Sequence, residues 1–273
     1  MRSATIRPRS PALAPFIEHI SYHENDFPLA FERILPRGGV DLMVNFHENA
    51  FRTYHGVRNE IITKTHGAVL GGPSSRSTVI DTQEMRCLMN VSFRYGGAWP
   101  FFKMPLEEAH NQLVELDQIW GRDGATLRER LLETRSLEAK FQLIEFILLA
   151  HLSRAQALDP LIPFAISAFD RGTPVAAVAS RLGQLPKSFV RRFRSQTGLS
   201  PKRFSRILRM QRFLRAASSS REVDWADLAA EHGFTDQAHM VHEFREFTSL
   251  TPTTYRPRSA GEHNHVPVVS GPR

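Results

Sequence analysis

The sequence has a single cysteine and no long apolar run, and both absences limit what the chain can be. Cys87 has no partner for an internal disulfide. It alternates with Met85, Met89 and Val91 on one side of a strand-like stretch, so we expect a buried strand cysteine rather than a nucleophile. No segment reaches the roughly 20 apolar residues that span a bilayer, and "MRSATIRPRSPALAP" lacks the apolar centre of a signal peptide. We predict a cytoplasmic protein with no membrane contact.

The signatures of common enzyme chemistry are also missing. The chain has no glycine loop for phosphate, no G-x-S-x-G turn, no H-E-x-x-H pair and no paired cysteines. His47, His55 and His66 lack the close H-x-H pair and positioned carboxylate of a barrel metal site. We therefore expect no enzymatic activity, no cofactor and no metal.

Acidic residues are absent from one long segment. Between Asp170 and Glu222, 51 consecutive residues contain 13 Lys and Arg and no acid. Residues 160–258 hold 16 Lys and Arg against 8 Asp and Glu, whereas residues 1–159 hold 18 against 19. A one-sided positive field attracts polyanions, of which nucleic acid is the commonest in a cytoplasm. Taken alone, the charge is equally consistent with a solvated face.

The N-terminal part alternates apolar and polar residues as strands do. "FERILPRGGVDLMVNFHE" and "MRCLMNVSFRY" show this pattern, and turns such as "GGPSSRS" separate them. After Leu106, "TLRERLLET" and "SLEAKFQLIEFILLAHL" predict two helices, the second capped by Ser136. That second helix is apolar on nearly every side, so it needs burial within the domain or against another chain.

The expected fold is therefore α+β. Residues 1–152 form a β-rich, barrel-like (cupin-like) domain with helices at its C-terminal end. Residues 153–159 form a linker, 160–258 an all-α domain, and 259–273, rich in Gly, Pro, His and Val, a disordered tail.

The all-α segment contains an internal repeat. "VAAVASRLGQLPKSFVRRFRSQTGLSPKRF" (175–204) aligns with "WADLAAEHGFTDQAHMVHEFREFTSLTPTTY" (225–255), first at an offset of 50 and, after one inserted residue, of 51. The shared positions are Ala176/Ala226, Ala179/Ala229, Gly183/Gly233, Phe193/Phe244, Arg194/Arg245, Thr197/Thr248, Leu199/Leu250, Pro201/Pro252 and Phe204/Tyr255. Each copy predicts a helix ended by glycine, a tight turn and a second helix, which is a helix-turn-helix. The histidines of "AEHGFTDQAHMVHEF" then belong to a repeated helix and not to a metal or acid-base site.

A long amphipathic helix is predicted between the two copies. Its arginines recur at every third residue: Arg203, Arg206, Arg209, Arg212 and Arg215. Such side chains contact DNA phosphate, cover the core with their stems, or bond acidic residues of the second unit. The sequence leaves these alternatives open.

The two units, their connecting helix and "GFTDQAHMVHEFREFTSLTPTTYR" resemble the DNA-binding domain of AraC/XylS-type transcription regulators. The resemblance covers residues 160–258. It implies that both units enter successive major grooves of DNA, with recognition helices near Pro186 to Gln196 and Asp236 to Phe247.

The resemblance also implies which side chains face DNA. In the first unit these are Lys187, Ser188, Arg191, Arg192 and Arg194, and in the second Thr235, Asp236, Gln237, Ala238 and His242. Leu185 departs from the family, because it replaces the usual capping Ser. His242 stands where Arg is common, so we expect the second unit to be less basic and to bind DNA more weakly. We also expect its binding to strengthen as the pH falls toward 6, because the histidine then becomes charged.

Residues from Ile6 to Leu152 resemble the sensor-like domains of a subset of these regulators through "ILPRGGVDLMVNF", "VSFRYGGAWPFF" and "LVELDQIWG". The resemblance implies a small effector and a homodimer formed through this domain. Candidate pocket residues are Phe93, Arg94, Trp99, Phe101 and Phe102, with packing onto the core as the alternative.

The sequence thus predicts a sequence-specific DNA-binding transcription regulator associated with the nucleoid, with double-stranded DNA as its partner. The alternative is a DNA-acting repair enzyme or methyltransferase fused to such a domain, for which Cys87 is the only available reactive thiol.

Overall fold

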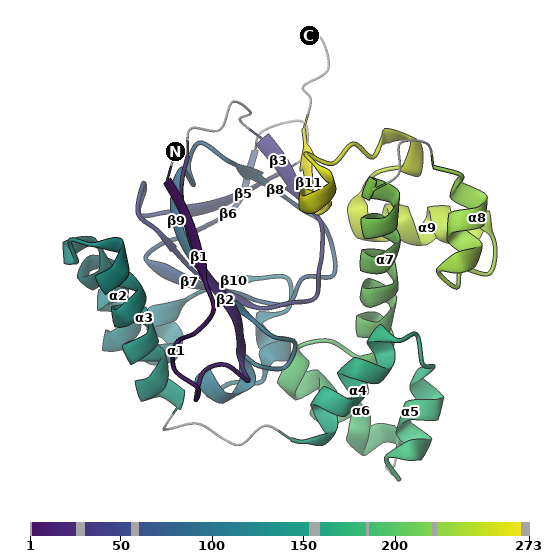
Figure 1. Ribbon diagram of the computed structural model, residues 1–273, viewed down its shortest axis with the longest axis horizontal. Helices are drawn as coiled ribbons and strands as arrows, with labels where there is room; N and C mark the ends of the chain where they lie inside the picture. Colours follow the sequence, from purple (N-terminus) through teal and green to yellow (C-terminus); the bar gives the residue numbers. More distant parts are fainter. Residues whose placement is uncertain are drawn as a thin grey trace.

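The computed structural model describes residues 2–25, 31–55, 60–152, 159–183, 186–219 and 223–268. Its N-terminal part consists of two antiparallel sheets, with strand orders β1-β2-β9-β4-β7-β10 and β11-β3-β8-β5-β6 (Figure 1). The strands are β1 (Arg2–Ile6), β2 (Ile17–Glu24), β3 (Phe31–Ile34), β4 (Asp41–Asn45), β5 (Phe51–His55), β6 (Glu60–Thr65), β7 (Ala68–Gly71), β8 (Thr78–Asp81), β9 (Cys87–Phe93), β10 (Leu113–Glu115) and β11 (His265–Pro267). The α+β prediction is confirmed, with two open sheets in the described residues in place of a closed barrel.

Alternation along the strands separates the two faces of the six-stranded sheet. Val91 and Phe93 of β9 point into the N-terminal core, whereas Asn90 and Ser92 point the opposite way. Cys87 packs against this core and is half-buried, with its Sγ 3.2 Å from the hydroxyl of Tyr22. The strand placement of the cysteine is as predicted.

Three helices cover the core face of this sheet, namely α1 (Leu116–Trp120), α2 (Arg122–Glu133) and α3 (Leu137–Leu152) (Figure 1). Ser136 caps α3 as predicted, because its hydroxyl accepts a hydrogen bond of 3.1 Å from the Ala139 amide. One side of α3 stays uncovered, with Phe146 66% exposed. Two short 3-10 helices, η1 (Trp99–Phe101) and η2 (Leu106–Ala109), precede β10.

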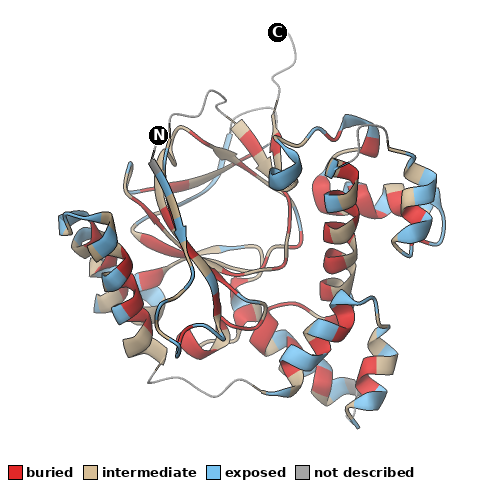
Figure 2. Ribbon diagram, viewed as in Figure 1, coloured by how far each residue is buried: buried red, intermediate tan, exposed pale blue. Residues whose placement is uncertain are grey.

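The C-terminal part is all helical up to residue 254. Its elements are α4 (Leu161–Asp170), α5 (Val175–Arg181), α6 (Pro186–Thr197), α7 (Pro201–Ser219), α8 (Trp225–Glu231), α9 (Gln237–Thr248) and the 3-10 helix η3 (Pro252–Thr254). Helix α7 runs along the sheets and carries α4–α6 at one end and α8–α9 at the other (Figure 1). Helix α7 is buried along much of its length (Figure 2), and its buried Gln211 donates a 2.9 Å hydrogen bond to the Pro36 carbonyl of the N-terminal part. The prediction of two helix-turn-helix units joined by a long helix is confirmed.

The core of the helical part extends into the N-terminal part. Leu35 of the segment after β3 is 1% exposed and belongs to the same apolar cluster as α7. The ring of Tyr95 lies 5.1 Å from that of Phe204 at an interplanar angle of 86°. The two parts are therefore packed against each other through apolar side chains.

The prediction of a disordered tail from Ser259 is wrong for residues 259–268. These residues form the 3-10 helix η4 (Ala260–Glu262) and strand β11, which pairs antiparallel with β3. Val266 is 4% exposed in the helical core, and Arg258 forms an ion pair with the buried Glu32. The tail is ordered because β11 pairs with the edge strand β3 and because Arg258 binds the buried carboxylate of Glu32. The amino-acid composition of the tail contains no sign of these distant partners.

Three predictions fall on residues outside the described part: most of the linker (153–158), the effect of Leu185 on the first cap, and the end of the tail (269–273). Among the described residues, no helix combines the length and apolarity that crossing a bilayer requires.

Candidate DNA-binding interface

The sequence repeat is reproduced in the hydrogen bonds that end the two recognition helices. The Thr197 hydroxyl donates to the Phe193 carbonyl at 2.8 Å and accepts from the Leu199 amide at 3.4 Å. The Thr248 hydroxyl donates to the Phe244 carbonyl at 2.6 Å and accepts from the amide of Leu250 at 3.1 Å. A buried threonine at the equivalent position therefore stabilises the turn that follows each recognition helix.

The turns inside the units are also equivalent. Gly183 and Gly233 have φ angles of +57° and +75°, the left-handed region that ends a helix at low cost only with glycine. Ala179 and Ala229 are buried where the first helix of each unit meets its neighbours. The short side chain permits the close helix approach that the sequence predicts.

Helix α6 presents one face to solvent, since its opposite face buries Phe189 and Phe193. The exposed side chains follow helical spacing: Lys187, Val190, Arg191 and Arg194. Together with Glu107 they line a shallow depression. Three cationic side chains surround one valine, so this face is suited to the phosphates and base edges of a DNA groove.

Helix α9 presents the equivalent face. Asp236 caps it by accepting a 2.7 Å hydrogen bond from the His239 amide, and Met240 and Phe244 are buried beneath it. Its outward side chains also line a shallow depression: Gln237, Ala238, Val241, His242 and Arg245. At an offset of 51, the four positions Lys187, Val190, Arg191 and Arg194 become Ala238, Val241, His242 and Arg245.

Six predicted residues lie on these two faces: Lys187, Arg191 and Arg194 in α6, and Gln237, Ala238 and His242 in α9. Sequence reasoning missed Val190, Val241 and Arg245. The offset of 51 that matches Arg194 with Arg245 was sufficient to find all three.

The other predicted residues are placed differently. Ser188 is half-buried, and Arg192 turns aside to an ion pair of 3.2 Å with Asp159. Thr235 and Asp236 are exposed at the start of α9, but their main-chain and side-chain groups bond His239. These four residues flank the two outward faces.

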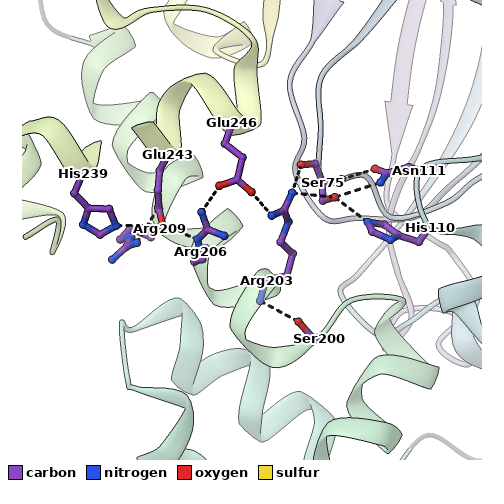
Figure 3. A network of polar contacts seen from close by, with 10 residues as sticks. All are labelled: Ser75, His110, Asn111, Ser200, Arg203, Arg206, Arg209, His239, Glu243 and Glu246. Carbon is purple, nitrogen blue, oxygen red and sulfur yellow. Dashed lines mark hydrogen bonds and ion pairs between the residues drawn. The ribbon is translucent and has the colours of Figure 1, made fainter. Parts of the chain in front are cut away.

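The arginines of α7 are engaged within the protein. Arg206 contacts both Glu243 and Glu246 of α9, Arg209 bonds Glu243 at 2.8 Å, and Arg203 pairs with Glu246 (Figure 3). Among the alternatives for this helix, bonding to acids of the second unit is the one found for these three arginines. The guanidinium of Arg206 also lies 5.1 Å from the centre of the Phe247 ring.

This cluster holds its carboxylates ionised. Burial alone would raise the pKa of Glu243, but the hydrogen bonds and charges of Arg209 and Arg206 lower it below the usual value. The pKa of Glu246 is lowered in the same way, because Arg206 and Arg203 outweigh its burial. The second recognition helix is thereby fixed to the connecting helix by charge.

The network continues into the N-terminal part. Arg203 donates to the Ser75 carbonyl at 3.2 Å, and the Ser75 hydroxyl lies 2.8 Å from Nε2 of His110 (Figure 3). Nearby, Arg194 of α6 forms an ion pair of 3.0 Å with Glu107 of η2. The N-terminal part therefore contacts both the connecting helix and the first recognition helix.

Gly198 explains how closely the two parts approach. It follows α6 with a φ of +78°, in the place that Ser249 occupies after α9 with a φ of +58°. A Cβ atom at Gly198 would lie 2.2 Å from Pro73 Cγ and 2.8 Å from the Leu106 carbonyl oxygen. The first unit needs glycine here because Pro73 and the Leu106 carbonyl leave no room for a Cβ atom. The second unit carries Ser249 at this position, and its hydroxyl accepts a 3.2 Å hydrogen bond from that of Ser77.

The proposed apolar effector pocket is not formed by the residues suggested for it. Phe93, Phe101 and Phe102 are at most 3% exposed, and Phe93 lies 5.2 Å and 5.7 Å from the other two rings. Trp99 packs against the same core, and Arg94 is exposed and bonds the Ala14 carbonyl. The packing alternative is correct, because strand and turn place these rings on the helix-covered face.

The candidate metal histidines are engaged separately. His47 Nε2 lies 3.1 Å from an Arg86 nitrogen, and His66 Nδ1 lies 3.3 Å from Glu115. His55 is exposed at the end of β5.

Residues 178–258 match the family model of a helix-turn-helix domain, and residues 4–115 match that of a domain of unknown function, DUF6597. No curated protein matches the chain. The chain is similar to ToxT from Vibrio cholerae: an apo variant from strain SCE256 is 8% identical with a TM-score of 0.44, covering 86% of this chain and 95% of that one. Wild-type ToxT with unsaturated fatty acid is 9% identical with a TM-score of 0.42, covering 86% and 92%.

The residues of the family match coincide with the two units whose turns, caps and outward faces repeat each other. Residues 178–258 therefore form a helix-turn-helix domain of the kind that this family model describes.

Proposed function

We propose that this protein is a sequence-specific transcription regulator that reads double-stranded DNA with α6 and α9. The observation that carries the proposal is the equivalence of the two outward faces, centred on Val190 with Arg194 and on Val241 with Arg245. Solubility alone requires no duplicated turn, cap and face. Two such faces on one rigid connecting helix suit two successive major grooves.

The chemistry of the first face fits base recognition. Arg191 is exposed in the middle of α6 and has the donor geometry that pairs with the O6 and N7 atoms of guanine. Lys187 and Arg194, at the edges of the face, are placed for phosphate. The second face carries fewer cations, so the first unit is proposed to dominate affinity. The residues flanking the faces, Ser188, Arg192, Thr235 and Asp236, are proposed to contact the DNA backbone or to orient their neighbours.

The N-terminal domain (1–152), joined by the linker at 153–159, is proposed to adjust DNA binding in response to a small effector. A polar cluster lies on the face of the six-stranded sheet that turns away from α1–α3. Asp41 accepts hydrogen bonds from Arg37, Ser92 (2.7 Å) and Asn90 (3.3 Å), while the buried Oδ1 of Asn90 has no hydrogen-bond partner among the described residues. A polar effector that donates to this oxygen is the proposed ligand, since an unpaired buried acceptor is costly. A thermal-shift screen of small metabolites, with Asn90→Leu as the comparison, tests it.

A homodimer through the N-terminal domain is a further part of the proposal. Phe146 on α3 is 66% exposed and Leu132 at the end of α2 is 43% exposed. A second copy would cover these apolar side chains. Sedimentation of the wild type and of Phe146→Ser tests whether this helix carries the contact.

The alternative of a DNA-acting enzyme depends on Cys87. Burial raises the pKa of the Cys87 thiol, so the reactive thiolate is disfavoured at neutral pH. The thiol also faces the N-terminal core and not the outward faces of α6 and α9. We propose that the protein has no enzymatic activity and acts on DNA in the cytoplasm. A DNA-dependent alkyl transfer that is lost in Cys87→Ser would favour the alternative.

Footprinting on the promoter region of the protein's own gene tests the main proposal. We expect protection over about two helical turns per monomer, from the spacing of two major grooves. Affinity should fall steeply as salt rises, and Arg191→Ala should cost about 1–3 kcal/mol on the specific site. Equal affinity for unrelated duplexes would exclude sequence-specific regulation.

A further inference from the structure

Two valines occupy the same place on the two recognition helices. Val190 is 36% exposed on α6, and Val241 is half-buried 51 positions later on α9. Each valine lines the depression of its own helix. Of the four outward positions that the units share, only this one and that of Arg194 and Arg245 hold the same residue in both.

Core packing explains only part of the pair, because Val241 packs with its buried side against the helical core, whereas Val190 is exposed and does not belong to that core. Val190 borders Glu107 of the N-terminal domain, but every described side chain that lines the depression of Val241 belongs to α9 itself. Helix stability does not explain it either, because a β-branched side chain on an exposed helical surface is less favourable than Lys, Glu or Ala. The same choice in both copies points to a shared contact outside the chain.

The major groove of DNA offers one apolar group on its base edges, the 5-methyl group of thymine. The neighbours of each valine are cationic or polar and suit phosphates and the polar edges of bases, whereas the valine itself suits a methyl group. We propose that Val190 and Val241 each contact a thymine methyl group and select thymine at one position in each half of the binding site. This inference rests on the proposed function, since it requires α6 and α9 to enter the major groove.

The equivalence of the units fixes the spacing of the two thymines. Because both valines hold the same position on equivalent helices, their thymines lie about one helical turn, or about 10 base pairs, apart. The first thymine lies beside the base that Arg191 reads. The second lies beside the base that His242 faces.

Selection of bound duplexes from a random library by the full-length protein is the first experiment. We expect an enriched site with two thymines about one helical turn apart. If no sequence is enriched, the proposed function fails. If a site is enriched without the paired thymines, the proposed function stands and this inference is overturned.

Deoxyuridine in place of each thymine is the second experiment, because it removes only the 5-methyl group. The wild type should lose about fourfold in affinity for each replacement, which corresponds to about 0.8 kcal/mol per buried carbon group. Val190→Ala should abolish the loss at the first thymine and keep it at the second, and Val241→Ala should do the reverse.

Ile62→Ala is the matched control, since Ile62 is an exposed apolar residue (59%) on β6, away from both faces. It should keep the wild-type response to deoxyuridine at both positions. An unchanged affinity of the wild type after either replacement, or the same loss in Val190→Ala as in the wild type at the first thymine, would overturn the inference.

Discussion

Arg194 of the first recognition helix forms an ion pair with Glu107 of the N-terminal domain, whereas the equivalent Arg245 lies in a depression lined only by α9. Among the described residues, a carboxylate therefore lines the depression of the first outward face, and none lines that of the second. Under the proposed function, DNA phosphate and Glu107 compete for the same guanidinium, which would couple the N-terminal domain to DNA binding at this residue.

Glu107→Gln should therefore raise the affinity of the protein for its specific duplex. The ion pair is partly exposed, with 58% of the Arg194 side chain and 33% of the Glu107 side chain accessible. Exposed pairs contribute about 0.2–1 kcal/mol, so we expect a gain of up to about fivefold, measured by fluorescence anisotropy. Glu108→Gln, the exposed neighbour, removes the same charge without the ion pair. Equal gains in affinity in both variants would show that the effect comes from the change in net charge and not from loss of the Arg194–Glu107 ion pair.

Gly198→Ser should separate the first unit from the N-terminal domain. Serine keeps the left-handed turn that Ser249 adopts in the second unit, but its Cβ would collide with Pro73 and the Leu106 carbonyl. We expect faster amide hydrogen exchange at residues 74–75 and 106–110, because overpacking of about 1–3 kcal/mol is relieved by parting the two surfaces.

Gly233→Ser is the matched control for this variant. Its φ of +75° imposes nearly the same backbone strain as the +78° of Gly198, but no atom lies within 4 Å of the added Cβ. Exchange at residues 74–75 and 106–110 should stay unchanged in Gly233→Ser. Equal exchange rates in the two variants would show that the close contact at Gly198 has no role in docking.

Val266→Ala should weaken the attachment of the tail. Val266 is 4% exposed in the core shared with Leu35, and the substitution removes two buried methyl groups. We expect a loss of about 1–2 kcal/mol in the free energy of unfolding by urea. Val268→Ala is the control, since Val268 is only half-buried and its main-chain bond to Phe31 is kept. A smaller effect of Val266→Ala than of Val268→Ala would contradict the role of β11 in this core.

The repeat made the C-terminal architecture predictable from the sequence. A glycine at the turn, an alanine at the helix contact and a threonine before the next helix act through neighbours a few residues away, so each leaves a local pattern. The two units and their recognition helices could thus be predicted to within a residue or two. The offset of 51 also contained Val190, Val241 and Arg245, which simple inspection of charge overlooked.

The remaining features depend on contacts between distant segments. The residues next to the α7 arginines in the sequence do not indicate whether these side chains face DNA or Glu243. In the same way, the residues around Arg192 do not indicate that it pairs with Asp159. Strand β11 is only three residues long and gains its order from the edge of β3. Such partners are set by tertiary packing, which one sequence read alone does not contain.

Glu243→Ala should destabilise the second unit more than any other acidic substitution on α9. Glu243 is 3% exposed and bonds both Arg206 and Arg209, whose side chains are 24% and 21% exposed. Removing one partner of a buried pair costs about 3–5 kcal/mol, and we expect the lower end because the arginines reach water. Glu246→Ala, with 30% exposure, should cost less than about 1 kcal/mol in the same urea titration.

The pH dependence of unfolding separates charge from packing at this cluster. The folded pKa of Glu243 lies below the usual 4.5, because the bonds from Arg209 and Arg206 outweigh burial. The stability that the carboxylate contributes is therefore fully present above pH 4.5 and is lost as the pH falls through the lowered pKa. Glu243→Gln keeps the shape of the side chain but not its charge, so its unfolding free energy should fall less than that of the wild type between pH 5 and pH 3. Parallel losses in the two proteins would place the acid sensitivity elsewhere.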